Sequence, residues 1–418
     1  MKKSSFPKGS SQYINKLNKI KILNLIRESG TISRADAAKL SGISAPTVTR
    51  IVETLIHEEG LVRDIGEGVS SGGRRPKLLE FAGLDNFVIG VDLGTTHIHG
   101  VLSNLNAEVI AEEKCNTRVE DGFQKIIEKT SEVIHRLQNH SSVKNKKIFG
   151  IGMAVAGLIN REKNIVEYSP DFHWKDADIL AEMRSDIDIP IIFDNVTRVM
   201  ALGELWYGVG KALKNFIVVN VGYGIGAGII VNGKPLYGPR GMAGEFGHIT
   251  LDKNSTVRCE CGNYGCLEAL ASGRAIALAA QRELENGNSS LLTKMANDDL
   301  SDITAEMVAS AAREGDSLAG SIFNSAAEYI GIGIAGLINL ISTEAIILGG
   351  GVSQSWDLLF NPVKRTITKR AIDTISRNVQ VQPATFGIKA AVMGSVALIL
   401  NEVLHLNHKS GIPEPQEL

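Results

Sequence analysis

Hydrophobic residues in the first 80 positions recur in short segments that are separated by turn signals. Their spacing predicts helices over about 14–28 and 34–40, and a third helix that follows Ser44. Two strands, 61–65 and 77–81, are predicted next, on either side of a stretch rich in Gly and Ser. Three short helices followed by a two-stranded ribbon are typical of a winged helix-turn-helix domain.

The third predicted helix has a single apolar stripe with helical spacing, formed by Val48, Ile51, Val52, Leu55 and Ile56. In a helix-turn-helix unit such a stripe packs on the domain, and polar residues near the N-terminus of the helix meet base edges in the major groove. The candidate groove contacts are Ser44, Thr47, Thr49 and Arg50.

The stretch between the two predicted strands ends in Gly72-Gly73-Arg74-Arg75-Pro76. The small residues permit a close approach, and Arg74 and Arg75 supply guanidinium groups that suit a narrow minor groove. The alternative is a flexible hairpin whose arginines only add solubility. The position directly after a helix-turn-helix unit favours the DNA contact.

Charge is distributed unevenly along the chain. Residues 1–80 hold 14 Lys and Arg against 8 Asp and Glu, a net of +6, whereas the whole chain carries −2, so the remainder carries −8. A basic segment on an acidic body predicts that only the N-terminal part meets a polyanion such as DNA. On charge alone, a solvated lysine-rich tail is the alternative.

After about residue 84 the pattern changes to strands that alternate with helical stretches, which predicts an α/β fold. The predicted strands are 87–92, 148–155, 216–220, 229–231 and 345–348, and the third and fourth of them flank a glycine-rich turn. Residues suited to holding phosphates at strand ends are Asp92, Gly94, Thr95, Thr96, Gly222, Gly224, Gly349 and Gly350. Each loop alone is weak evidence, but three in one body suggest the two-lobed actin-like, ribonuclease H-like architecture of sugar kinases.

The cysteines indicate a metal site rather than a disulfide framework. Cys115 stands alone, whereas His248, Cys259, Cys261 and Cys266 form the pattern H-x10-C-x-C-x4-C. One imidazole and three thiolates make a closed tetrahedral set, the usual arrangement of structural zinc. Because four protein ligands leave no position for a catalytic water, we expect the zinc to shape a loop rather than to catalyse hydrolysis.

Three segments resemble the ROK family of repressors, open reading frames and sugar kinases. They are the run 245–248 (Glu-Phe-Gly-His), the cysteine-rich run 259–268, and Asp92-x-Gly94-x-Thr96. The likeness covers roughly residues 12–405, and with the added winged helix the chain is similar to the family's regulators.

The resemblance implies three structural units. They are a winged-helix domain at 1–83, a first lobe at 84–195 to which 386–406 return, and a second lobe at 196–385 that carries the zinc site. It also implies a monosaccharide site formed by Gly157, Asp171, Asn195, Glu245, His248 and Glu268. Carboxylates suit this role because each can accept two hydrogen bonds from adjacent sugar hydroxyls. One nitrogen of His248 is expected to bind zinc and the other to meet the sugar.

The chain departs from the kinase members of the family where catalysis needs a base. Those kinases carry an Asn-Asp-Ala-Asn stretch, and here Val196 stands in place of the aspartate. Valine cannot accept a proton, which removes a factor on the order of 10²–10⁴ in rate. An alignment shifted by two residues would instead make Asp194 the base. Tyr223 and Asp171 also replace residue types that are usual in the kinases, which indicates a non-catalytic homologue.

The sequence therefore predicts a sugar-responsive repressor of carbohydrate-utilisation genes, which binds operator DNA as a homodimer or a tetramer and is released by a monosaccharide. The alternatives are an active ATP-dependent sugar kinase with a DNA-binding head, and a body that recruits a protein partner. Xylose, glucose and N-acetylglucosamine all remain candidate ligands. No apolar leader is present and no apolar run approaches membrane-spanning length, so we expect a cytoplasmic protein without membrane contact.

Overall fold

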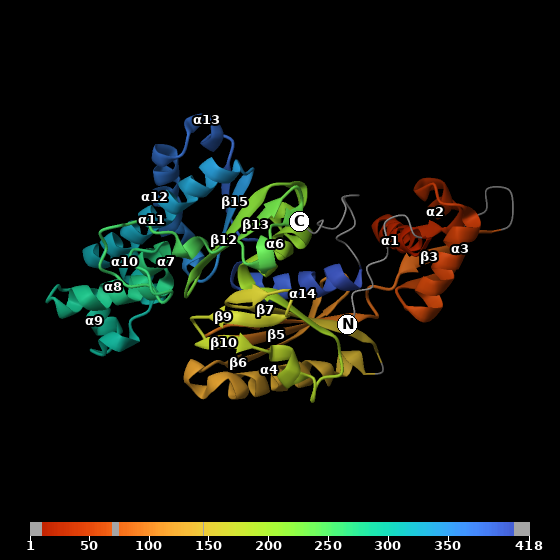
Figure 1. Ribbon diagram of the computed structural model, residues 1–418, viewed down its shortest axis with the longest axis horizontal. Helices are drawn as coiled ribbons and strands as arrows, with labels where there is room; N and C mark the ends of the chain where they lie inside the picture. Colours follow the sequence, from red (N-terminus) through yellow and green to blue (C-terminus); the bar gives the residue numbers. More distant parts are fainter. Residues whose placement is uncertain (1–10, 69–74, 145, 405–418) are drawn as a thin grey trace.

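The computed structural model describes residues 11–68, 75–144 and 146–404. A small N-terminal domain lies at one end of the molecule, and a two-lobed body forms the rest (Figure 1). This is the predicted winged helix-turn-helix domain followed by an actin-like α/β body.

The N-terminal domain contains three helices: α1 (Ser11–Ser29), α2 (Arg34–Ser41) and α3 (Ala45–Glu53). The side chain of Ser33 accepts a hydrogen bond from the Asp36 N–H and so caps α2, as such residues do at helix starts. Ser44 holds the N-cap position of α3 but makes no side-chain cap hydrogen bond there. Val48, which belongs to the apolar stripe, is fully buried. Helix α3 is followed by a short π-helical turn, Thr54–Glu58.

The wing has one more strand than predicted. β2 (Val62–Glu67) and β3 (Lys77–Phe81) form the expected ribbon, and β1 (Thr31–Ser33) pairs with β3 on its other side. The strand β1 is only three residues long, so no alternation of apolar and polar residues could reveal it. Its presence gives the ribbon the order β1-β3-β2.

The junction between the N-terminal domain and the body is held by hydrogen bonds. The Nδ2 of Asn86 donates to the carbonyls of Gly60 and Ala82, both at 2.8 Å. The backbone N–H of Leu105 donates to the carbonyls of Gly83 and Asn86, and Leu105 directly follows a strand of the body. The two parts of the molecule are therefore joined by specific contacts rather than by a loose tether.

The first lobe is built on a five-stranded mixed sheet with the order β11-β7-β4-β5-β6. Its strands are β4 (Phe87–Leu93), β5 (His97–Asn104), β6 (Val109–Asn116), β7 (Ile148–Val155) and β11 (Ile191–Asn195). Helix α4 (Gly122–Gln138) covers one face. A second, three-stranded sheet contains β8 (Leu158–Asn160), β9 (Ile165–Ser169) and β10 (Trp174–Ala177), and leads into α5 (Ile179–Met183).

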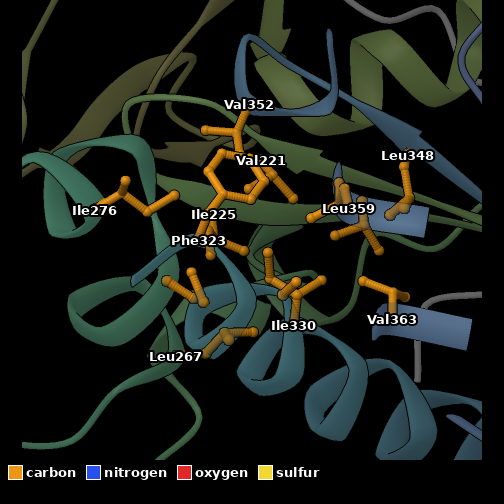
Figure 2. Close-up of a cluster of buried hydrophobic side chains, with 14 of the residues drawn as sticks. Val221, Ile225, Leu267, Ile276, Phe323, Ile330, Leu348, Val352, Leu359 and Val363 are labelled. Carbon is orange, nitrogen blue, oxygen red and sulfur yellow. The ribbon is translucent and has the colours of Figure 1, made fainter. Parts of the chain in front are cut away.

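The second lobe has its own five-stranded sheet, with the order β14-β13-β12-β15-β16. Its strands are β12 (Phe216–Val221), β13 (Ile225–Val231), β14 (Lys234–Pro235), β15 (Ala345–Gly349) and β16 (Gln380–Pro383). Its helices are α7 (Leu267–Ala271), α8 (Gly273–Glu285), α9 (Leu291–Met295), α10 (Ala305–Arg313), α11 (Ser317–Ile341), α12 (Trp356–Arg370) and α13 (Asp373–Ser376). Figure 2 shows sheet residues such as Val221 meeting Leu267, Phe323 and Leu359 in one apolar core.

Helix α14 (Ala390–Val403) lies between the two lobes (Figure 1). It packs on β4 and β7 of the first lobe and on α6 (Val196–Tyr207). Glycine makes this close approach possible. A Cβ on Gly152 would overlap the Ser395 carbonyl oxygen, and one on Gly90 would lie 2.8 Å from the carbonyl of Val392. The exact domain boundaries predicted above stay a prediction.

From the sequence we expected the glycine-rich run after β12 to be one long turn, and the structure shows that it is not. The turn is confined to Gly222–Gly224, and Gly226 and Gly228 belong to β13. The reason is packing against α6, because a Cβ on Gly226 would lie 2.7 Å from Thr197 Cγ2. Glycine serves here to let a helix approach a strand rather than to turn the chain.

Helix α11 corrects the expectation that no apolar run approaches membrane-spanning length. By length and composition alone it could cross a bilayer. Half of its most apolar window is buried, and it packs against α7, α10 and α12. The core helix of a globular domain meets the same criteria, and these contacts place α11 in that class.

The substitution Gly152→Ala tests the packing of α14. We expect it to lower the free energy of unfolding by about 1–3 kcal/mol, because the added methyl group meets helix backbone that cannot rotate away. Urea denaturation followed by circular dichroism measures the change. The matched control is Gly320→Ala in α11, where a Cβ has nothing within 4 Å, and which should be neutral or stabilising. An equal response of both variants would contradict this account of the α14 contact.

Candidate functional site

The predicted metal ligands lie together at the edge of the second lobe. The ligand atoms of His248, Cys259, Cys261 and Cys266 all lie within 4.8 Å of one another. Cys259 Sγ is 3.6 Å from His248 Nδ1, and the Sγ atoms of Cys261 and Cys266 are 3.7 Å apart. A tetrahedral ion with sulfur bonds of about 2.3 Å separates its sulfur ligands by roughly 3.7–3.8 Å. These two separations suit such an ion, so the donor set could hold a metal.

Burial makes a cation necessary if these thiols are to ionise. It raises the pKa of Cys259, and it raises the pKa of Cys266 as well. Thiolates are the forms that bind metals, and a bound cation compensates for the lost hydration. The chemistry of the donor set fits a resident metal ion.

Local structure brings the four ligands together. His248 ends a short 3-10 turn, Phe246–His248, and Cys266 directly precedes α7. Isolated bridges at Thr250–Cys266 and Arg258–Tyr264 fold the intervening loop onto itself. Leu267, which follows the last cysteine, is buried in the apolar core of Figure 2.

Three carboxylates surround this cluster on the side of the cleft. Glu245 Oε2 lies 3.9 Å from His248 Nε2, so the nitrogen of His248 that does not face Cys259 is directed at a carboxylate. Glu268 Oε2 accepts a hydrogen bond from the Ile225 N–H at 2.8 Å. A Cβ on Gly224 would lie 3.9 Å from Asp171 Oδ2, which places this first-lobe carboxylate beside the glycine turn.

The electrostatics of these carboxylates reflect their burial. Burial, helped by the negative charge of Glu268 and opposed by the positive charge of His248, raises the pKa of Asp171 to about 6. Burial also raises the pKa of Glu245, while the positive charges of His248 and Arg198 oppose that shift. Close carboxylates that are partly withdrawn from water are suited to accepting hydrogen bonds from the hydroxyls of a neutral polyol.

The first lobe contributes Gly157 and Asn195, and the two are bonded to each other. Asn195 Nδ2 donates to the Gly157 carbonyl at 2.9 Å, and its Oδ1 accepts from the N–H and the hydroxyl of Thr197. Gly157 has a φ of +125° and lies against Ser169, two residues before Asp171. Asp171, Glu245, His248 and Glu268 therefore lie close enough to act on one another's charge, and Gly157 and Asn195 form a bonded pair on the first lobe. The sugar contacts of all six residues stay a prediction.

Asp194 is not placed as a free base. Its Oδ1 accepts hydrogen bonds from Arg198 Nε at 3.0 Å, from Arg198 Nη2 at 2.6 Å and from the Asn195 N–H at 2.7 Å. Both side chains of this ion pair are 2% exposed. Val196, the first residue of α6, has no proton acceptor in its side chain. Sequence reasoning missed Arg198, although its spacing of four residues from Asp194 was a visible signal.

Two of the predicted glycine loops line cavities that share Tyr223. Thr95 and Thr96 line a cavity together with Arg118 and Tyr223, and Tyr223 also lines the cavity that contains Asp171 and Glu268. Tyr223 therefore borders both the cavity at the predicted phosphate loop and the cavity that contains the carboxylates.

The remaining loop residues have the tight local geometry expected at strand ends. Burial raises the pKa of Asp92 to about 7, and Gly94 donates its N–H to the His97 carbonyl. The turn at Gly222 closes on the Gly224 carbonyl, and Gly350, which follows Gly349 at the end of β15, has a φ of +89°.

The predicted groove contacts lie at the start of α3 and within it, and most of them are exposed. Ser44, Thr49 and Arg50 are exposed, and Thr47 is half-buried with its hydroxyl 2.8 Å from that of Ser44. Arg50 Nη2 donates to Asn15 Oδ1 at 2.8 Å, a partner on α1 that the sequence did not suggest.

On the wing, Arg75 is 68% exposed and lies 3.8 Å from Glu67, which leaves its guanidinium largely open to solvent. Arg74 lies outside the described residues.

Known proteins share both parts of this architecture. The chain matches the ROK family over residues 88–402 and the winged helix-turn-helix DNA-binding domains over residues 16–63. It is 32% identical to the xylose repressor of Caldicellulosiruptor bescii over 396 residues, which cover 95% of this chain and 98% of that protein. It is 33% identical to the glucokinase of Halalkalibacterium halodurans over 316 residues, which cover 75% of this chain and 95% of the kinase.

Among solved structures, a ROK family transcriptional regulator described as a homologue of the Escherichia coli MLC protein is similar over almost its whole length. The TM-score is 0.80 at 28% identity, and the match covers 94% of this chain and 97% of that one.

Substitutions of Asn195 test how the first-lobe side of the site is built. We expect Asn195→Ala to lower the free energy of unfolding by about 1–2 kcal/mol, because α6 loses its N-cap acceptor. Asn195→Ser keeps a cap acceptor while losing the amide that reaches Gly157, so it should cost less. Chemical denaturation of the two variants measures the difference. Equal losses would show that capping contributes nothing here.

Proposed function

The chain belongs to the ROK family, and on that basis we propose that it is a sugar-responsive transcriptional repressor of carbohydrate-utilisation genes. The observation that carries this proposal is the fusion of a winged helix-turn-helix domain to a cleft lined by carboxylates from two lobes. The similarity to a xylose repressor over nearly the full length of both chains supports it. The groove contacts are Ser44, Thr47, Thr49 and Arg50, with Arg75 and Arg74 on the wing.

The ligand is a monosaccharide held by Asp171, Glu245 and Glu268, with His248 between the last two. Xylose is the first candidate, because relatives of similar length are named xylose repressors. Gly157 and Asn195, which are hydrogen-bonded to each other, would contribute the first-lobe contacts to the sugar together with Asp171. The carboxylates accept hydrogen bonds from adjacent hydroxyls, which fixes the orientation of the ring.

Phosphotransfer is not part of this function, although a glucokinase is among the relatives. Val196 offers no base, and Asp194 is buried with its Oδ1 accepting two hydrogen bonds from Arg198. Tyr223 fills space between the phosphate loop and the carboxylates. The loops at Gly94 and Gly350 are therefore architectural remnants of a nucleotide site.

The metal ion is a structural zinc, bound by His248 Nδ1 and the three thiolates. Zinc prefers four ligands of this kind in structural sites and leaves no open position there for substrate. It fixes the loop between His248 and Cys266, and so it holds Glu245 and Glu268, which flank this loop, in place. A zinc-bound His248 would also help to fix the position of the Glu245 carboxylate, since its Nε2 faces Glu245.

Binding of DNA and of sugar must be coupled for the protein to act as a switch. A homodimer or tetramer would present two winged-helix domains to a pseudo-palindromic operator. Closure of the cleft on sugar changes the angle between the lobes, and the junction at Asn86 carries that change to the winged-helix domain. By linkage, sugar and DNA weaken each other's binding by the same factor. The protein acts in the cytoplasm, where the DNA is.

A DNA-binding titration tests the proposed function. The full chain is mixed with labelled DNA from upstream of its own and neighbouring genes, and xylose, glucose and N-acetylglucosamine are added in turn. We expect specific binding that one sugar releases. The variant Arg50→Ala should weaken binding, because a groove contact of this kind contributes about 1–3 kcal/mol. Absence of DNA binding at moderate salt would contradict the repressor, and sugar-dependent ATP consumption would instead support the kinase.

Loss of one metal ligand tests the zinc site. We expect Cys259→Ser to reduce bound zinc from one ion per chain to nearly none, measured by elemental analysis after gel filtration. The same variant should lose sugar affinity, because the loop that carries the carboxylates is no longer fixed. The control is Cys115→Ser, which lies outside the cluster and should retain the ion. Equal zinc content in both variants would contradict the assignment.

A further inference from the structure

The chain passes from the first sheet to the second lobe between β11 and α6, and a buried ion pair spans this crossing. Asp194 is the next-to-last residue of β11, and Arg198 lies in the first turn of α6. Neither side chain is accessible to a ligand. A buried pair of this kind contributes little net stability compared with apolar residues of the same size, so stability alone does not account for it.

Arg198 has a third hydrogen bond that leads toward the site. Its Nη1 donates to the Ala243 carbonyl at 3.1 Å. Ala243 lies two residues before Glu245, in a segment that also folds back through the bond from the Ala243 N–H to the Tyr237 carbonyl. The Gly244 carbonyl then accepts from the N–H groups of Ala227 and Phe246. The backbone on the N-terminal side of Glu245, and with it the orientation of the Glu245 side chain, therefore depends on a few specific hydrogen bonds.

The first lobe supports the same segment from the other side. The guanidinium carbon of Arg161 lies 3.8 Å from the centroid of the Tyr237 ring, and that of Arg198 lies 5.7 Å from it. The backbone N–H of Arg161 donates to the backbone carbonyl of Arg240. The side chain of Arg240 forms an ion pair with Glu167 of β9 at 3.7 Å. Two arginines anchored on different elements thus enclose the tyrosine at the base of the segment.

We propose that Arg198 is a positioning residue of the sugar site. Asp194 fixes the guanidinium, the guanidinium holds the Ala243 carbonyl, and this contact directs the carboxylate of Glu245 into the cleft. Arg198 itself does not touch the ligand. The proposal rests on the proposed function in one respect, namely that Glu245 binds the sugar.

A double substitution separates this role from a purely structural one. Arg198→Met alone should unfold more easily, because it leaves the buried charge of Asp194 without a partner. The double variant Asp194→Asn with Arg198→Met has no buried charge, so its unfolding midpoint should return close to that of the parent. The bond to Ala243 is still missing in it. We therefore expect stability to recover while sugar affinity does not.

Two measurements on the full chain test whether the double variant has lost the positioning of Glu245. The first is the dissociation constant for the sugar that releases DNA, which should rise roughly tenfold or more in the double variant, as expected for a lost charge-assisted hydrogen bond. The second is hydrogen–deuterium exchange over residues 237–248, which should speed up by a similar factor. The matched control is Asp357→Asn with Arg313→Met, which removes an exposed bidentate pair elsewhere in the second lobe and should change neither quantity.

The outcomes are distinguishable. A double variant that binds sugar with parental affinity and exchanges at the parental rate overturns the role of Arg198. A parent chain that binds none of the sugars contradicts the proposed function instead. In that case the exchange rate over 237–248 still decides whether Arg198 fixes the segment.

Discussion

The close packing of α14 between the lobes is the constraint on which the arrangement of the body depends. The helix approaches β4 and β7 at glycines, and its own Gly394 meets the Val199 backbone in α6. Residues of α14 such as Val396 and Leu400 belong to the same apolar cluster as Leu55 and other residues of the winged-helix domain. One continuous core thus contacts the first lobe, the crossing to the second lobe and the DNA-binding domain.

The sequence predicted those parts of the fold that are encoded by local patterns. The apolar stripe of α3 and the strand β7, at Ile148–Val155, were predicted correctly because their periodicity is complete within a few residues. The strand β1 was missed because it exists only through its pairing with β3. The start of β13 was predicted wrongly, since glycine can mark a turn or a close helix contact and the sequence does not distinguish the two.

The site shows the same division between local and distant information. The metal cluster could be predicted from the spacing of its ligands, three of which lie within eight residues. The carboxylates could be assigned only through family resemblance, because Asp171 meets Glu268 across nearly a hundred residues of chain. The spacing of Arg198 from Asp194 signals an ion pair, but its contact with Ala243 could not be predicted, since that partner is a carbonyl 45 positions away and any residue type would supply one.

The buried ion pair between Asp194 and Arg198 limits the chemistry that is available at the crossing between the lobes. A catalytic carboxylate must face the reacting hydroxyl with a free oxygen. Here the carboxylate of the crossing segment is turned into the protein, where its Oδ1 accepts three hydrogen bonds. A carboxylate that is buried and bonded in this way holds the arginine beside it in a fixed position. In the proposed role of Arg198, the crossing between the lobes fixes the position of a carboxylate in the cleft. A sensor needs such a fixed arrangement in order to distinguish its empty and bound states.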